Sequence, residues 1–261
     1  MTRPVLRTAA LVAALLAAPT FAQAQTTVTL EPSRDTALFQ EGDLSNGVGP
    51  HLYAGQTNLG DNRRSLLAFD FSSIPATATI NDATLTLTLS QVCPGCTSRT
   101  FTLHRVTGSW GEGTSDAGSP GGMGDAATAG DATWTDRVFG ISPWNNQGGD
   151  FVAMPSTTAT VQSLLGPYDF TGLAADVQAW VSGSTPNEGW ILIGEENAQR
   201  TALRFDSREN LNLAARPQLS VTFTTLPGTP QPTPATAVPG PGPAAIILLI
   251  LAVILLSRRW F

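Results

Sequence analysis

The clearest alternation of apolar and polar positions lies between residues 83 and 89. Ala83, Leu85, Leu87 and Leu89 are separated there by three threonines. A period of two places the apolar residues on one face of a strand and the β-branched threonines on the other. The pattern therefore predicts a half-buried strand whose threonine face meets water.

An earlier segment has the pattern of a strand that is covered on both sides. Residues 66–71 read LLAFDF, so apolar side chains fall on both faces. Residues 72–75 read SSIP, and a proline cannot give an amide hydrogen to a strand ladder. We expect a buried strand here, followed by a turn that leads to the strand at residues 83–89.

Part of this buried strand is matched late in the chain. Residues 64–70 read RSLLAFD, and residues 200–206 read RTALRFD. In both segments an arginine precedes an apolar pair, and an aspartate follows it. One interpretation is that the two segments are neighbouring strands of one sandwich, with Phe69 and Phe205 in the same core. The alternative is chance similarity between two amphipathic strands.

Other segments add three strands and one helix. We expect strands at residues 26–30, 101–106 and 190–193, with the last one buried. Residues 171–181 have apolar side chains at helical spacing, and Gly183 provides a stop signal. Within this helix Trp180 is expected in the core.

The composition agrees with an all-β domain. The chain has 261 residues, 25 glycines and 19 prolines, and only 13% of its residues are charged. Short apolar alternations separated by turn residues are typical of a sandwich or barrel. Without the two terminal segments described below, about 200 residues are left, which suits a single domain.

Residues 61–76, DNRRSLLAFDFSSIPA, resemble the opening signature of DNRLRE domains, a bacterial and archaeal group related to carbohydrate-binding module family 96. Other segments resemble the family's remaining motifs in the right order: residues 45–49, 52–55, 106–114, 130–134, 148–151, 176–180 and 216–223. The resemblance implies a jelly-roll-type β-sandwich on an exported protein, often beside polysaccharide-active enzymes. It does not imply catalysis.

The N-terminal segment has the pattern of a secretory signal peptide. Arg3 and Arg7 precede a short apolar stretch, and Ala22-Gln23-Ala24 has the small-x-small pattern of a cleavage site. We therefore expect residues 1–24 to be a signal peptide and residues 25–225 to form the exported domain. An uncleaved N-terminal anchor is the alternative.

The C-terminal segments predict a tether. Residues 226–243 are proline-rich and suit a stiff linker, and residues 244–256 are entirely apolar before an arginine pair. Residues 244–261 therefore predict a hydrophobic helix that anchors the protein in the membrane. The tail also resembles bacterial envelope-sorting signals, although Gly240 stands where the Pro-Glu-Pro form has glutamate.

The charge balance excludes one class of partner and permits another. The expected domain has ten arginines, no lysine and twenty acidic residues, which give a formal charge of −10. Such a surface repels nucleic acid, and it disfavours polyanionic sugars unless arginines cluster locally. Calcium suits it, and Glu41 and Asp43 are weak candidates for a calcium site. Their loop lacks the full spacing of a known calcium loop, which favours an ordinary Asx-turn.

Cys93 and Cys96 are the only cysteines, in a Cys-Pro-Gly-Cys loop between two strands. In an exported protein such a pair favours a disulfide that ties the loop. A redox site and a zinc site are the alternatives. The first lacks a thioredoxin-like helix, and the second lacks a fourth ligand.

The ligand-binding candidates are charged or aromatic side chains near the matching strands and near a long loop at residues 111–133. They are Arg64, Arg200, Arg204, Arg208, Trp110 and Trp144. Arginines pair with carboxylates such as those of uronic acids, and tryptophans stack on sugar rings. The alternatives are internal ion pairs for the arginines and core plugs for the tryptophans.

No serine elbow, nucleophile–base pair or histidine cluster is visible, so we expect no enzyme. The favoured function is a non-catalytic carbohydrate-binding or adhesion domain at the cell surface, with a polysaccharide or envelope glycan as partner. A structural envelope or biofilm-matrix protein without sugar recognition is the main alternative. A polysaccharide lyase or hydrolase is a third.

Overall fold

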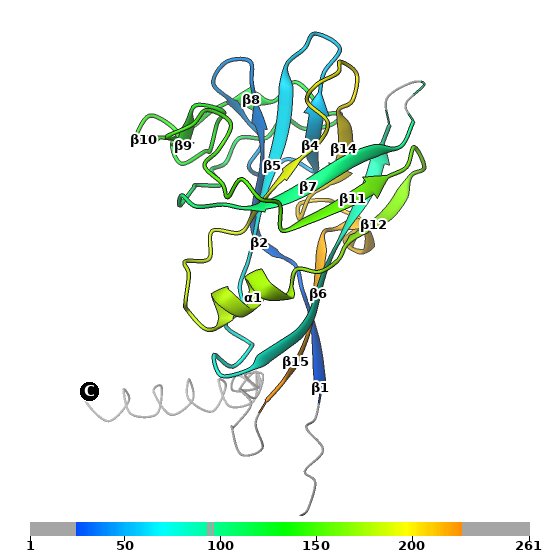
Figure 1. The fold of residues 1–261 in the computed structure, drawn as a ribbon. Coiled ribbons are helices and arrows are strands. Elements are labelled where there is room, and N and C mark those ends of the chain that lie inside the picture. Colours follow the sequence, from blue (N-terminus) through cyan, green and yellow to red (C-terminus); the bar gives the residue numbers. More distant parts are fainter. Residues whose placement is uncertain (1–24, 93–94, 96, 226–261) are drawn as a thin grey trace, which may run out of the picture.

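The structure is a computed structural model, and it describes residues 25–92, 95 and 97–225. The described chain is almost all β, with a single α-helix and a short 3-10 helix (Figure 1). The strands are β1 (Gln25–Leu30), β2 (Pro32–Phe39), β3 (Leu44–Ser45), β4 (His51–Gln56), β5 (Asn62–Phe69), β6 (Thr79–Gln91), β7 (Arg99–Arg105), β8 (Asp125–Ala126), β9 (Asp136–Val138), β10 (Ser142–Pro143), β11 (Thr157–Val161), β12 (Gly166–Phe170), β13 (Trp190–Ile193), β14 (Leu203–Asp206) and β15 (Gln218–Thr224).

Eleven of these strands form one antiparallel sheet that curls around the core (Figure 1). Its path runs β1-β15-β6-β14-β4-β5-β13-β7-β11, with β12 also paired to β6 and β2 to β5. The part around β6 and the part around β5 face each other across a shared core and are joined by the β4–β5 pairing. The expected all-β sandwich with one short helix is confirmed.

The alternation at residues 83–89 is confirmed in β6. Ala83, Leu85, Leu87 and Leu89 are buried, and the threonines between them are half-buried. The threonine face also carries polar pairs, since Thr86 Oγ1 donates to a carboxylate oxygen of Asp169 at 2.7 Å.

The two matching segments share one core but are not adjacent strands. Phe69 of β5 and Phe205 of β14 belong to the same apolar cluster, and Phe205 makes an edge contact with Phe101 at 5.5 Å. However, β4 lies between β5 and β14 in the sheet. The structural likeness also excludes the start of the second segment, because β14 begins only at Leu203 and Arg200 lies in a turn. The expectation of neighbouring strands was therefore wrong, whereas the shared core is confirmed.

The predicted helix forms over a shorter range than expected, as α1 (Ala174–Val181). Trp180 is buried and makes an edge contact with the Trp190 ring at 4.5 Å between centroids, as expected for a core residue. Gly183 adopts a φ of 71° just after the helix, and its N–H donates to the Trp180 carbonyl at 3.1 Å. A left-handed residue at this position is the usual helix stop.

The other face of β5 is covered by the chain between β7 and β11. A second apolar cluster lies there, formed by Leu38, Leu66, Ala68, Val106, Trp110, Ala132, Trp134, Trp144 and Ile191. In Figure 1 this covering segment, which contains β8, β9 and β10, lies beside β2 and β5. The buried, double-faced character of residues 66–69 is thus confirmed.

One turn of this covering segment is tied by a single carboxylate. Asp150 accepts four hydrogen bonds, from the backbone N–H and the side-chain amide of both Asn145 and Asn146, at 2.9–3.1 Å. Burial works to raise the pKa of Asp150, but these donors outweigh it and hold the pKa below its ordinary value.

The two ends of the domain lie side by side. Strand β1 pairs with β15 along its whole length, from Gln25 opposite Thr224 to Leu30 opposite Leu219. The expected signal peptide (1–24), linker (226–243), hydrophobic tail (244–261) and cysteine pair (Cys93, Cys96) lie outside the described residues. Within residues 25–225 as described, no helix is long and apolar enough to cross a membrane.

Candidate functional site

The four candidate arginines do not meet in one groove. Arg64 extends from β5 into an ion pair with Glu196, with Nε and Nη2 each 2.7 Å from a carboxylate oxygen. Its Nη1 donates to the Gly148 carbonyl at 2.8 Å, and its guanidinium lies 4.8 Å from the centre of a Trp134 ring. These contacts leave 14% of the side chain exposed, so Arg64 is part of the internal packing.

Arg208 is also committed to internal partners. Its Nε and Nη2 donate to Glu112 at 2.9 and 2.7 Å, and Nε is 2.9 Å from Glu209 Oε1. For Arg64 and Arg208 the ion-pair interpretation therefore describes the structure better than the ligand-binding one.

Arg200 and Arg204 both line a cleft of about 560 Å³. Arg204 also donates from Nε and Nη2 to the hydroxyl and the carbonyl of Ser90, at 3.2 and 3.3 Å. The cleft lies at the end of the sandwich that carries the β4–β5 turn and the turn before β14, which appear together at the top of Figure 1. The long loop between β7 and β9 adds Met123 to its lining. The charged residues of the lining are Arg63, Arg200, Arg204 and Glu41.

The turn that carries Arg200 is held against the β4–β5 turn. The Arg200 N–H donates to the Thr57 carbonyl at 3.1 Å, and Thr201 Oγ1 accepts the Gln56 N–H at 2.8 Å. Arg200 has a φ of 63°, and it is the one non-glycine residue with a positive φ in the described part of the chain. Backbone in this region is strained for a residue with a Cβ, and such positions concentrate at binding sites.

The floor of the cleft is built from paired polar groups. Arg63 is 2% exposed, binds the Glu41 carboxylate with both terminal nitrogens, and lies 4.8 Å from the centre of the Phe39 ring. The Tyr53 hydroxyl donates to the Pro120 carbonyl. Burial raises the pKa of Tyr53 from about 10 to about 12, so this hydroxyl remains a donor even in alkaline solution.

The mouth of the cleft combines apolar and polar side chains. Leu59 and Met123 are 77% and 74% exposed there. Asn58 and Gln91 add side-chain amides, which both donate and accept hydrogen bonds. The Gln56 amide already donates to Asn62 Oδ1 and to the Glu196 carbonyl, both at 3.1 Å. A ligand in this cleft would meet apolar surface, amides and guanidinium groups together.

The two candidate tryptophans lie in the covering layer rather than on a ligand surface. Trp110 is 2% exposed, and its Nε1 donates to the Glu188 carbonyl at 2.8 Å. Trp144 is 5% exposed and donates to the Thr133 carbonyl at 2.9 Å. Because no sugar can stack on a ring buried in the second apolar cluster, we remove both residues from the candidate site. The core-plug alternative describes them.

The candidate calcium residues Glu41 and Asp43 make contacts with other parts of the protein. Both Glu41 carboxylate oxygens are engaged by Arg63, while Asp43 is exposed and its carbonyl accepts the Ala127 N–H at 2.9 Å. Neither residue belongs to the group of three acids that lie close enough to share a cation in the described part of the chain, so the structure does not favour a cation at Glu41 and Asp43.

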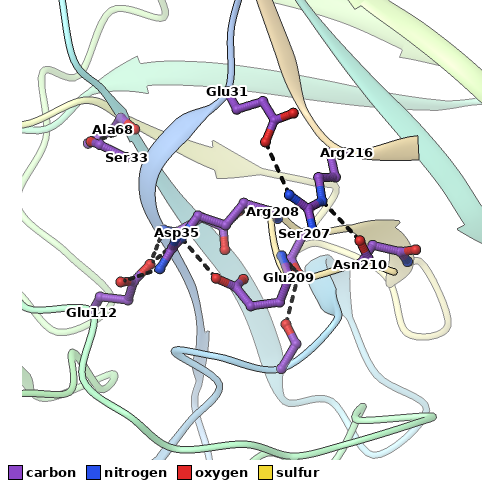
Figure 2. A network of polar contacts seen from close by, with 11 residues as sticks. Glu31, Ser33, Asp35, Ala68, Glu112, Ser207, Arg208, Glu209, Asn210 and Arg216 are labelled. Atoms are coloured by element: carbon purple, nitrogen blue, oxygen red, sulfur yellow. Dashed lines mark hydrogen bonds and ion pairs between the residues drawn. The ribbon is translucent and has the colours of Figure 1, made fainter. Parts of the chain in front are cut away.

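A different set of acids does converge, on the side of β2 that faces away from β5. Asp35, Glu112 and Glu209 each place a carboxylate oxygen within 4.8 Å of the others. Asp35 lies in β2, Glu112 follows Trp110 in the covering segment, and Glu209 follows β14. Figure 2 shows the Arg208 side chain among these carboxylates. We call these three acids the acidic cluster.

Asp35 is the fully buried member of the acidic cluster. Its N–H donates to Glu112 Oε1 at 2.7 Å, and its Oδ2 accepts the Arg208 backbone N–H at 2.9 Å. Its Oδ1 is buried without a hydrogen-bond partner, and so is Oε2 of Glu209. Burial and the nearby Glu209 carboxylate raise the pKa of Asp35 well above its ordinary value, and burial also raises the pKa of Glu209.

Sequence reasoning missed the acidic cluster because its members are far apart in the chain. Asp35 and Glu112 are 77 positions apart, and Glu112 and Arg208 are 96 apart. Each acid stands alone in its own segment, so no metal-ligand spacing exists along the sequence. The only signal was indirect, since Glu112 lies inside one of the motifs that resemble DNRLRE domains.

Comparisons with known proteins leave the family open. The sequence matches no protein-family model, and no curated protein matches it. The resemblance to DNRLRE domains and to carbohydrate-binding module family 96 therefore stays a prediction from the residue motifs.

Proposed function

We propose that this protein is a non-catalytic carbohydrate-binding or adhesion domain that acts outside the cell, with the cleft as its binding site. The observation that carries the proposal is the local charge. The Arg63–Glu41 ion pair in the lining carries no net charge, and the remaining charged residues of the lining are Arg200 and Arg204, in a domain whose formal charge is −10. A basic cleft on an acidic protein concentrates anionic ligands at that one place.

The lining also suits the chemistry of a sugar chain. Guanidinium groups donate paired hydrogen bonds to carboxylates, and the amides of Asn58 and Gln91 match hydroxyl groups. The exposed side chains of Leu59 and Met123 provide apolar surface for the C–H faces of sugar rings. A cleft of about 560 Å³ lies within the usual range of ligand sites. A glycan that bears carboxylates, such as a polyuronate, fits this combination best.

The test is affinity electrophoresis of the purified protein in gels that contain polyuronates or neutral polysaccharides. We expect retention by at least one carboxylate-bearing polymer, and about tenfold weaker retention for Arg200→Gln and for Arg204→Gln. Arg216→Gln is the matched control, because Arg216 pairs with Glu31 away from the cleft. Thermal unfolding checks that each variant is folded.

Two results would end the proposal. The first is the absence of retention by every polymer, with and without added calcium. The second is retention that the two cleft variants leave unchanged, since binding would then take place elsewhere.

The extracellular location rests on the terminal sequence patterns. Export by the signal peptide predicts a mature chain that begins near Gln25, and tail processing predicts the loss of the C-terminal arginines. Intact-mass measurement of envelope-extracted and released protein tests both. A mass that retains residues 1–24 would contradict export with cleavage, and retention of Phe261 in all fractions would exclude processing.

A further inference from the structure

The acidic cluster contains more negative charge than its surroundings balance. Three carboxylates carry a formal charge of −3, and the Arg208 guanidinium between Glu112 and Glu209 contributes +1, so the net formal charge is −2. Asp35 is 0% exposed, so water does not offset its charge. Unbalanced buried charge is costly, and proteins meet this cost with a proton, a further cation or a metal ion.

Two carboxylate oxygens of the cluster mark where a positive group is missing. Asp35 Oδ1 and Glu209 Oε2 are buried, and no donor among the described residues serves either oxygen. The two carboxyl groups interact with each other, and two ionised carboxylates have no hydrogen to share. The Asp35 oxygen is the more informative one, because the other oxygen of the same carboxylate accepts the Arg208 backbone N–H and the strand holds the side chain in place. Buried acceptors without partners are uncommon in proteins.

From this geometry we propose that Asp35, Glu112 and Glu209 bind a divalent cation of the calcium class. The three contributed oxygens lie within 4.8 Å of one another, and ligands on opposite sides of a calcium ion are separated by roughly 4.8 Å. All three ligands are hard carboxylate oxygens, which calcium prefers and which softer metals do not require.

The net formal charge of the cluster favours a divalent cation over a shared proton. One proton between Asp35 and Glu209 satisfies both unpaired oxygens but leaves a formal charge of −1 in the cluster. A divalent cation satisfies the same two oxygens and brings the cluster to neutrality. Its third ligand would be Glu112, which would share its carboxylate between the ion and Arg208.

The proposed cation would join three segments that are distant in sequence. It would link β2, the covering segment after Trp110 and the turn after β14, so that one ion holds the covering layer and the sheet together. Since calcium bound only to the folded state stabilises that state by mass action, its effect appears in the unfolding temperature.

The experiment is a calcium titration of the purified protein after treatment with EDTA, followed by thermal unfolding and by calorimetry. We expect the unfolding temperature to rise by about 5 °C or more once calcium exceeds its dissociation constant about a hundredfold. Sodium chloride at matched ionic strength should leave it unchanged. Terbium gives a direct second readout, because Trp110 lies two residues from Glu112 and can sensitise terbium luminescence that calcium then displaces.

Three variants locate the ion. Asp35→Asn and Glu209→Gln each remove one ligand charge while keeping the shape of the side chain, and both should abolish the calcium-dependent rise. Asp43→Asn is the matched control, because it removes an exposed acid outside the cluster and should respond as the wild type does. Wild-type calorimetry and terbium luminescence still decide the question if a variant folds poorly.

Two outcomes overturn the proposal. Wild-type protein that shows no calcium heat, no terbium signal and no shift, but gains stability in EDTA as the pH falls, contains a shared proton instead. A calcium-dependent shift that survives in both Asp35→Asn and Glu209→Gln places the ion elsewhere.

Discussion

Replacing Arg64 by methionine tests whether this arginine stabilises the fold through its ion pair with Glu196. The substitution keeps an unbranched apolar stem but removes the guanidinium. The protein thereby loses two hydrogen bonds of 2.7 Å to Glu196, one of 2.8 Å to the Gly148 carbonyl, and the stacking on Trp134. Glu196 is then left without its partner, with 18% of its side chain exposed.

The expected cost follows from this burial. Removing one partner of a buried ion pair destabilises a protein by about 3–5 kcal/mol, because the remaining charge is uncompensated. Both side chains keep some contact with water, so we expect the lower end, about 3 kcal/mol. For a domain of this size that loss lowers the unfolding temperature by roughly 6–12 °C.

The assay is urea unfolding followed by tryptophan fluorescence, in a double-mutant cycle of Arg64→Met with Glu196→Gln. We expect a coupling free energy of about 2 kcal/mol, since the double variant removes both members of the pair. Arg99→Met is the control. Arg99 pairs with Glu195 at 3.2 Å, but the two side chains are 24% and 35% exposed, so its loss should cost less than about 1 kcal/mol.

The reasoning fails if Arg64→Met costs no more than Arg99→Met, or if the coupling between positions 64 and 196 is below about 0.5 kcal/mol. Either result would show that the ion pair contributes little to folding, and it would return Arg64 to the list of ligand-binding candidates.

Three further predictions concern single groups. Asp150→Ala should lower the free energy of unfolding by about 2–3 kcal/mol at pH 7, because it removes four hydrogen bonds. Since the folded-state pKa of Asp150 is lowered, the difference in unfolding free energy between wild type and variant, measured by urea unfolding, should shrink as the pH falls through that pKa. The pKa of Asp35 is raised instead, so its neutral form favours folding below about pH 4 and this contribution is lost as the pH rises. In EDTA the wild type should therefore lose stability relative to Asp35→Asn as the pH rises from about 4 through the raised folded-state pKa, and equal pH profiles would contradict this. Gly189→Ala should cost roughly 3 kcal/mol or more, since a Cβ there would lie 2.0 Å from the Leu67 carbonyl oxygen, whereas Gly183→Ala, with a similar φ and open space around it, should cost about 1 kcal/mol in the same assay.

The strands were predictable because their signal is local. Period-two alternation at residues 83–89 and the double-faced apolar run at residues 66–69 depend only on neighbouring positions, and both are confirmed in β6 and β5. The match between residues 64–70 and 200–206 was less informative. It correctly predicted a shared core for Phe69 and Phe205, but similar patterns do not specify which strands pair.

The candidate site was less predictable because it depends on contacts between distant positions. Arg64 and Glu196 are 132 positions apart, and no spacing along the chain distinguishes a paired arginine from a free one. The fate of Trp110 likewise depends on whether the covering segment folds over β5 or away from it. The left-handed backbone at Arg200 also had no sequence signal, because neither glycine nor asparagine occupies that position.

The pairing of β1 with β15 has a mechanical consequence. The chain enters and leaves the domain at one pole, whereas the β4–β5 turn that borders the cleft lies at the opposite pole (Figure 1). A force that pulls Gln25 and Thr224 apart would break the hydrogen bonds between these two strands one after another, from that end of the pair. A load on only one of the two ends would pass into the domain through the intact ladder, at the pole opposite the β4–β5 turn.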